Sequence, residues 1–273
     1  MSKDKMERKI VGLALGSGAA RGLAHIGVLE VLEREGIPID MIAGTSAGAV
    51  VGAMYAQGKD TNLIKKLALD LGWKRLAPLA DLALPKTGFI EGKKIKEQLK
   101  LIIGDVKFSD LNIPFACVAT DVMTGEEVII NQGSVLEGVR ASISIPVIFT
   151  VANWKGKYLV DGGLVNPVPV SVLKNMGADF IIAVNVIPNF KMRINQKEKL
   201  KEPNLFNVLI QCIYIGAYLL VRTSLKEADI AIEPQLVHVG ASEFRKAEEC
   251  ISQGRKAAEQ AIPQIKKQLA LNV

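Results

Sequence analysis

The pentapeptide Gly44-Thr45-Ser46-Ala47-Gly48 is the feature that most constrains the fold of this chain. It has the G-x-S-x-G pattern of a nucleophile elbow, in which a strand turns sharply into a helix and leaves the serine exposed at the tip. Gly44 and Gly48 suit this turn, because one lets the backbone adopt strained dihedral angles and the other lets helix and strand pass close together. The pattern also arises by chance, so its meaning depends on the sequence around it.

The segments on either side of the pentapeptide predict alternating strands and helices. Apolar runs typical of buried strands cover residues 10–15 and 38–43. Apolar residues at helical spacing run from Leu23 to the stop at Gly36, and a helix of small residues is expected over 47–57. This order is typical of a parallel α/β sheet. We therefore expect a mainly parallel central sheet flanked by helices on both faces.

The rest of the chain continues the pattern. The sequence predicts further strands over 115–120, 127–130, 157–160 and 180–187, and helices over 133–142, 169–176 and 242–273. Interrupted helices are expected over 61–101, whose middle, residues 73–89, is either a lid or a long connection. Residues 205–221 are the most apolar stretch. Polar or aromatic residues recur on one face of this stretch, so it is predicted to be an amphipathic helix rather than a membrane span of about 20 apolar residues. The residues of this face are Asn207, Gln211, Tyr214, Tyr218 and Arg222.

Composition predicts one globular domain over residues 1–273, with the motifs in a core of about 10–190 and a helical part over about 200–273. The net charge of +6 is spread along the chain, which excludes a nucleic-acid-binding tail and permits contact with anionic head groups. Cys117, Cys212 and Cys250 form no C-x-x-C pair, so neither a disulfide framework nor a zinc site is expected. The apolar run 10–15 is too short for a signal peptide, so we expect a cytoplasmic protein.

A reactive serine needs donors that stabilise a developing oxyanion. The loop Ser17-Gly18-Ala19 follows the first predicted strand, and parallel sheets bind ligands at the carboxyl ends of their strands. The backbone N–H groups of this loop are therefore the candidate oxyanion hole. A dinucleotide-binding loop is the alternative, but Arg21 stands where the third glycine of that motif belongs. Arg21 itself is expected beside the site, paired with an acid, facing an anionic substrate group, or in a structural ion pair.

The serine also needs a base, and the chain has only His25 and His238. A conventional triad would run Ser46, then Asp121 or Asp161, then His238. However, His238 lies in an alternating, strand-like piece over 236–239, where a structural role is expected. Asp161 stands at the end of an apolar strand, and the two glycines after it, Gly162 and Gly163, allow close approach.

Asp121 shares the strand-end position, but the Thr124-Gly125 turn beyond it favours a turn role, so Asp161 is the preferred base. Ser142, Ser144 and Pro146 fit either a wall of the substrate site or a turn that ends a helix.

Taken together, four ordered blocks resemble the patatin-like phospholipase family, in its single-domain bacterial branch. The match covers residues 10 to about 190, and each block alone is a weak signal. The blocks are Ser17-Gly18-Ala19-Ala20-Arg21-Gly22, Gly44-Thr45-Ser46-Ala47-Gly48, Ala141-Ser142-Ile143-Ser144-Ile145-Pro146 and Asp161-Gly162-Gly163.

The resemblance implies a patatin-like hydrolase fold with a catalytic dyad, in which Ser46 is the nucleophile and Asp161 the general base. It also implies an oxyanion hole in the loop from Ser17 to Ala19, with Arg21 at the family's basic position, and no metal or other cofactor. The family loop is usually a run of glycines, and here Ser17 and Ala19 replace two of them. Since any residue except proline offers a backbone N–H, the hole can survive, although the added side chains narrow the pocket.

The implied function is hydrolysis of lipid esters, of the phospholipase, lysophospholipase or esterase type, through an acyl-serine intermediate. The expected partners are a lipid or lysolipid ester and, transiently, the inner face of a membrane, with no nucleic acid. The alternatives are a non-catalytic lipid-binding or regulatory protein on the same scaffold, a triad esterase that uses His238, and acyl transfer to an acceptor other than water. Sequence does not separate these, and it leaves the oligomeric state open.

Overall fold

The computed structural model describes residues 8–69, 92–146, 148–189 and 205–271. Within them the strands form one eight-stranded mixed sheet, whose hydrogen-bonding path runs β5-β6-β3-β2-β1-β7-β8, with β4 also paired to β3. The neighbours β3-β2-β1-β7-β8 are parallel, and β4, β5 and β6 join antiparallel. The strands are β1 (Val11–Leu15), β2 (Met41–Thr45), β3 (Phe115–Asp121), β4 (Glu127–Ile130), β5 (Ala152–Trp154), β6 (Lys157–Asp161), β7 (Phe180–Val184) and β8 (Ile230–Ile232).

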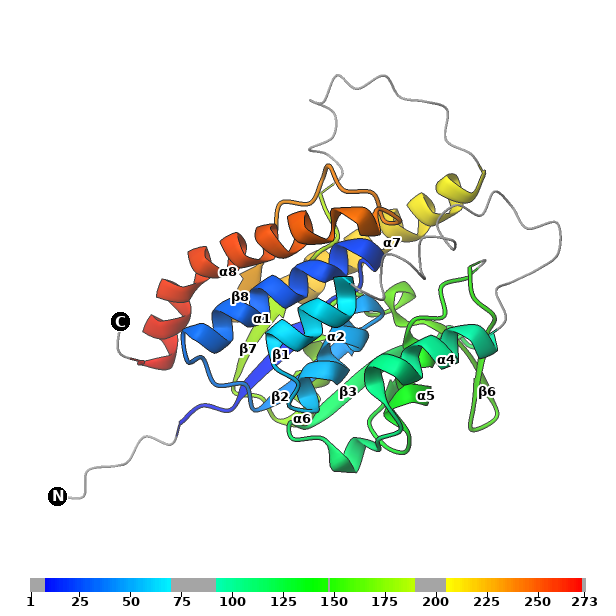
Figure 1. Ribbon diagram of the computed structural model, residues 1–273, viewed down its shortest axis with the longest axis horizontal. Helices are drawn as coiled ribbons and strands as arrows, with labels where there is room; N and C mark the ends of the chain where they lie inside the picture. Colours follow the sequence, from blue (N-terminus) through cyan, green and yellow to red (C-terminus); the bar gives the residue numbers. More distant parts are fainter. Residues whose placement is uncertain (1–7, 70–91, 147, 190–204, 272–273) are drawn as a thin grey trace.

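Helices cover both faces of this sheet, as Figure 1 shows. One face packs against α1, α2, α4, α5 and α8, and the other against α6 and α7. Helix α8 lies along α1 (Figure 1). The helices are α1 (Ala24–Arg34), α2 (Ala47–Ala56), α4 (Gly92–Ile103), α5 (Val135–Ser142), α6 (Val170–Met176), α7 (Leu205–Lys226) and α8 (Ala247–Leu269), and residues 61–69 are also helical.

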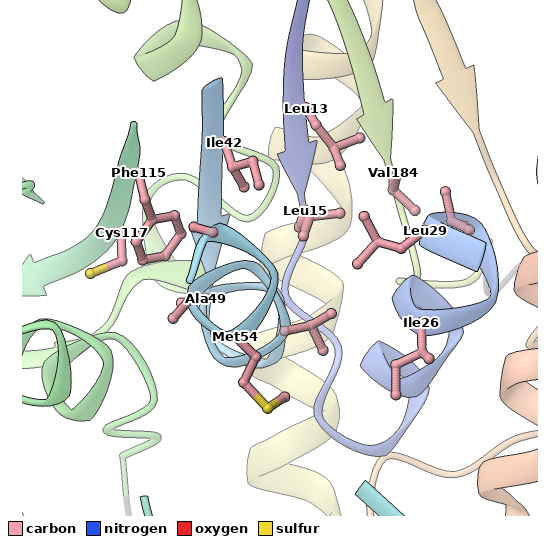
Figure 2. Packing of buried hydrophobic residues seen from close by; sticks show 14 of the residues in the cluster. Leu13, Leu15, Ile26, Leu29, Ile42, Ala49, Met54, Phe115, Cys117 and Val184 are labelled. Carbon is pink, nitrogen blue, oxygen red and sulfur yellow. The ribbon is translucent and has the colours of Figure 1, made fainter. Parts of the chain in front are cut away.

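The two faces take alternate residues of the buried strands, because successive side chains of a strand point to opposite sides. On the α1 and α2 face, large side chains such as Leu13, Leu15 and Ile42 pack against Ile26 and Leu29 of α1 and Met54 of α2, as Figure 2 shows. On the other face, small residues lie side by side in register: Ala14 of β1 pairs with Ala43 of β2 and with Ala183 of β7. Fully buried faces explain why these strands read as continuous apolar runs.

The fold class predicted from the sequence is confirmed: a mainly parallel sheet with helices on both faces. Two short strands, β5 and β8, were not predicted. Residues 236–239, predicted to be strand-like, lie in a turn instead, and no ladder pairing is found for them in the described residues. The segment 73–89, for which a lid was considered, lies outside the described residues.

Helix α7 differs from the amphipathic helix that the sequence predicts. Tyr214, which was grouped with the polar residues, is buried, whereas the apolar Ile215 and Leu219 are exposed. The stretch Val208–Lys226 is the one described helix that is long and apolar enough to cross a membrane, and only 17% of its most apolar window is buried. The apolar side chains of α7 therefore point both toward and away from the protein.

Candidate active site

The pentapeptide forms the sharp turn that its pattern predicts. Strand β2 ends at Thr45, α2 begins at Ala47, and Ser46 between them has φ 55° and ψ −120°, a strained conformation for a residue with a Cβ. A Cβ on Gly48 would lie 2.1 Å from the carbonyl oxygen of Leu15, so only glycine lets α2 begin this close to the end of β1. The turn thus presents Ser46 at the carboxyl edge of the parallel strands.

The hydroxyl of Ser46 donates a hydrogen bond to Asp161 Oδ2 at 2.5 Å. Both side chains are almost fully buried. The Ser46 N–H donates to Ser142 Oγ at 2.9 Å, which holds the strained residue from the side of α5. The structure therefore brings Ser46 and Asp161 together and leaves the serine oxygen's lone pairs available for attack.

Strand β3 explains why these two residues meet. β2 pairs with Phe115–Val118, while β4 occupies the opposite edge over Cys117–Thr120. Since β6 pairs with Ala119–Asp121, it must lie on the same edge as β2, directly after it. Thr45 is therefore opposite Val118 and Asp161 opposite the next residue, Ala119. One edge of β3 thus sets Ser46 and Asp161 side by side.

The carboxylate of Asp161 is fixed at both oxygens. Oδ1 accepts from the Gly163 N–H at 2.7 Å and Oδ2 from Ser46, while the main-chain oxygen of Asp161 accepts from Thr120 Oγ1 at 2.9 Å. Burial raises the pKa of Asp161 to about 6, although the hydrogen bonds that it accepts from Ser46 and Gly163 lower the pKa in part. A carboxyl group that titrates near neutral pH is suited to accept and return a proton.

The loop Ser17-Gly18-Ala19 runs beside this pair. The Ser17 N–H donates to the Pro167 carbonyl at 2.8 Å, so it is already engaged. Among the described residues, no hydrogen bond is found from the N–H of Gly18 or Ala19. Ala19 has φ 49°, a left-handed conformation that favours glycine, and it adopts this conformation with its Cβ in place. The structure thus narrows the predicted donors to Gly18 and Ala19.

Arg21 is buried close to this loop and lines the cavity over Ser46. Its Nε donates to the Val239 carbonyl at 2.7 Å, and its guanidinium lies 5.2 Å from the centre of the Tyr214 ring. These contacts join the segment after the loop to α7 and to the chain before α8. They support a structural place for Arg21 next to the site.

The histidines are engaged elsewhere. His25 Nε2 lies 2.7 Å from the Gly16 carbonyl, so it carries the proton, and burial lowers the pKa of His25 to about 4. His238 Nε2 lies 2.5 Å from Glu249 Oε1 on the protein surface and is not part of the cavity lining. The triad alternative therefore has no histidine beside Ser46 in this structure.

The second carboxylate weighed from the sequence, Asp121, takes the turn role expected of it. Its Oδ1 accepts from the Met123 N–H at 3.0 Å, and its Oδ2 lies 3.5 Å from Lys157 Nζ. Ser142, Ser144 and Pro146 were considered for a wall of the substrate site, and of these three only Pro146 lines the cavity. The hydroxyl of Ser144 donates to the Arg140 carbonyl instead.

A cavity of about 960 Å³ opens over Ser46 and Asp161. Apolar side chains dominate its walls, which come from α2, α4, α7 and the segment after α5. Among the described residues no cluster of three His, Cys, Asp or Glu side chains that could hold a metal ion is found. The cavity is large enough for an extended acyl chain, and its polar groups converge at one end.

The family model described as patatin-like phospholipase matches residues 13–174, more than half of the chain. The chain belongs to the patatin-like phospholipase family. The match includes all four sequence blocks, and the cavity, the elbow and Asp161 lie within or beside the matched patatin-like region.

Known relatives agree with this assignment. An uncharacterised NTE family protein of Mycobacterium tuberculosis is 38% identical over 64% of this chain and 49% of its own length. The lysophospholipase NTE1 of Scheffersomyces stipitis is 36% identical over 66% of this chain and 12% of its own length. The human patatin-like phospholipase domain-containing protein 6 is 34% identical over 64% and 13%. The chain thus spans half or less of the length of these relatives. The family match supports a lipid-ester hydrolase at the level of the family.

The crystal structure of VipD from Legionella pneumophila has the same fold, with a TM-score of 0.53 over 94% of this chain and 67% of that one at 14% identity.

Sequence reasoning missed two parts of the site. Ser142 was expected either in a wall of the substrate site or in a turn that ends a helix, whereas its hydroxyl accepts a hydrogen bond from the main-chain N–H of Ser46. Helix α7 was predicted to be amphipathic, with Tyr214 on its polar face, whereas Tyr214 and its neighbours form one side of the cavity. The unusual apolarity of 205–221 was the available signal, but no local pattern says which element such a helix contacts.

Proposed function

We propose that this protein is a lipid acyl hydrolase that uses Ser46 as nucleophile and Asp161 as general base. The observation that carries the proposal is the 2.5 Å hydrogen bond from Ser46 Oγ to Asp161 Oδ2 at the polar end of an apolar cavity. A family-level match to lipid-ester hydrolases supports the same reaction class.

In the first half of the reaction, Ser46 Oγ attacks the ester carbonyl carbon while its proton passes to Asp161 Oδ2. The carbonyl oxygen becomes an oxyanion, which the N–H groups of Gly18 and Ala19 are placed to stabilise. Collapse of this intermediate breaks the bond to the alcohol. Asp161 returns the proton to the departing oxygen, which leaves an acyl group on Ser46.

In the second half, water takes the place of the alcohol. Asp161 accepts a proton from the attacking water, a second oxyanion forms, and the bond to Ser46 Oγ breaks. Asp161 then returns the proton to Ser46, and a fatty acid is released. Because each proton leaves and returns through the same carboxyl group, the reaction needs no histidine.

The cavity favours a long acyl chain as the part of the substrate that is recognised. Its lining includes Met54 of α2, Ile95 and Leu99 of α4, and Ile213 of α7. Each methylene group of the substrate that is transferred from water into such an apolar cavity contributes about 0.8 kcal/mol to binding. We therefore expect the activity to rise with acyl-chain length among soluble esters and lysolipids.

The test is a hydrolysis screen with esters, lysophospholipids and diacyl phospholipids, with the Ser46→Ala protein as blank. A fluorophosphonate probe should label the wild-type protein and not Ser46→Ala. His238→Ala should keep most of the turnover, since His238 is bound to Glu249 away from the cavity. Loss of turnover in His238→Ala with full turnover in Asp161→Asn would favour the triad, and tight lysolipid binding without any ester cleavage would favour a lipid-binding protein.

A further inference from the structure

Helix α7 exposes an apolar row that the proposed chemistry does not explain. Leu219 is 68% exposed and Ile215 is 53% exposed, although both are large hydrophobic side chains. At 100° per residue they share one side of the helix with Val208. We call this row, with its two flanking leucines, the outer face of α7; its members are Val208, Leu209, Ile215, Leu219 and Leu220. A single exposed leucine is ordinary, whereas a contiguous apolar row marks an interaction surface.

The opposite side of the same helix holds it to the protein. Tyr214, Ala217 and Val221 are buried in the core between α7, α6 and the sheet. With 22 residues, α7 is about 33 Å long, which is enough to cross a bilayer. However, a helix packed along its length against a folded domain cannot cross without drawing that domain into the lipid. The geometry therefore favours a helix that lies on a surface over one that spans it.

The outer face is continuous with the catalytic cavity. Val208 and Ile215 are exposed and also line the cavity that contains Ser46 and Asp161. An acyl chain that leaves a lipid layer in contact with α7 would thus meet apolar side chains until its ester reaches Ser46. A protein partner on this face would instead close the approach to the cavity, which favours lipid as the occupant.

The charges near the outer face are complementary to anionic lipid. Helix α7 contains Arg222 and Lys226 and no acidic residue. The whole chain also has a net charge of +6. Basic residues beside an apolar helix face are the combination that binds anionic membrane surfaces.

We propose that the outer face of α7 docks the protein onto an anionic phospholipid surface, with the helix axis parallel to the surface and the cavity mouth turned toward the lipid. This inference deepens the proposed function, on which it rests for the class of substrate. Docking itself requires no catalysis, so the two are separable by experiment.

The test uses sedimentation with vesicles of phosphatidylcholine alone or of phosphatidylcholine and phosphatidylglycerol, with the Ser46→Ala protein so that the vesicles stay intact. Leu219→Glu places a charge on the outer face at a residue that does not itself line the cavity. Leu101→Glu is the matched control, because Leu101 is a 59% exposed leucine on α4. Leu219→Ser is the milder second variant, and thermal melting checks that each protein is folded.

We expect the Ser46→Ala protein to sediment with the anionic vesicles and to dissociate at high salt. Leu219→Glu should lower the partition coefficient about tenfold, while Leu101→Glu leaves it within about twofold. In the active background, Leu219→Glu should hydrolyse a soluble short-chain ester at the wild-type rate and vesicle lipid more slowly.

Several outcomes would overturn the proposal: no vesicle binding, equal binding to neutral and anionic vesicles, or equal effects of the two glutamate variants. A dimer that Leu219→Glu converts to a monomer, without vesicle binding, would assign the face to a second copy of the chain. Vesicle binding without ester hydrolysis by the wild-type protein would support docking and contradict the proposed hydrolase.

Discussion

Ser46 Oγ and Asp161 Oδ2 are joined by a 2.5 Å hydrogen bond across 115 residues of sequence, and the bond is buried. It exists because β2 and β6 follow each other along one edge of β3, so that the residue after Thr45 meets the last residue of β6. Burial also raises the pKa of Asp161 to about 6. The same arrangement thus aligns the proposed nucleophile with the proposed base and makes the ionised carboxylate unfavourable for the folded protein.

We expect Asp161→Asn to abolish turnover and to stabilise the protein. An Asp has a pKa of about 3.9 when unfolded and Asp161 about 6 when folded, so ionised Asp161 lowers the free energy of unfolding by up to about 3 kcal/mol above pH 6. Asparagine is neutral and can still accept from the Gly163 N–H. Thermal unfolding at pH 8 should show a melting temperature raised by about 5 °C.

The sign of this effect depends on pH. Between pH 4 and 6 the folded protein holds a proton on Asp161 that the unfolded chain has released, so wild-type stability falls as pH rises through this window. The advantage of Asp161→Asn should therefore shrink from pH 6 downward and disappear below about pH 4. An advantage that stays constant from pH 4 to pH 8 would contradict a raised pKa.

The rate of ester hydrolysis should follow the ionisation of Asp161. Because the base must be ionised to accept the Ser46 proton, kcat/KM for a soluble ester should rise with pH, reach half its plateau near pH 6, and fall about tenfold per unit below it. A histidine base would titrate at a similar pH. The profile must therefore be repeated with His238→Ala, in which the midpoint and the plateau should be unchanged.

Ser142→Ala should reduce kcat more than it changes KM. The substitution removes the acceptor of the Ser46 N–H, and an unsatisfied buried N–H costs about 1–3 kcal/mol. We expect kcat to fall about tenfold because the strained turn loses its lateral support. Ser134→Ala is the control, since Ser134 caps the other end of α5; it should lower the melting temperature and leave kcat unchanged. Equal effects on kcat would show that α5 acts only through stability.

Much of the fold could be predicted because its signals are local. Apolar runs predicted β1, β2 and β3, and one elbow glycine was correctly predicted to be a point of close approach. The strained dihedral angles predicted for the other glycine fall on Ser46 instead. Asp161 was preferred because it ends a strand and precedes Gly162 and Gly163. The structure places it beside Ser46, whereas its role as base stays a proposal.

The features that the sequence did not predict depend on contacts between distant segments. Nothing near Ser17 indicates that its N–H is bonded to Pro167, and nothing near Ser142 indicates that its hydroxyl meets Ser46. The alternation at 236–239 suggested a strand, but no neighbouring strand pairs with it in the described part of the sheet. Helix α7 has apolar residues on both sides, so periodicity alone could not assign its inner face.

His25 offers a test of how the loop from Gly16 to Ala19 is held. Its Nε2 donates to the Gly16 carbonyl at 2.7 Å, and Gly16 directly precedes the segment that contains Gly18 and Ala19, the proposed oxyanion donors. His25→Phe fills the same space without a donor, so the buried carbonyl loses its partner. We expect kcat to fall about tenfold with little change in KM, because the loop donors act on the oxyanion rather than on the bound ester.

His25→Gln places an N–H near the same carbonyl and should recover most of the lost kcat. Since the pKa of His25 is about 4, it is neutral throughout the active range, and the midpoint near pH 6 should be the same in His25→Gln and in the wild-type protein. A folded His25→Phe protein with wild-type kcat would show that the hydrogen bond to Gly16 does not position the loop. A shifted midpoint in His25→Gln would instead assign the acid limb to His25.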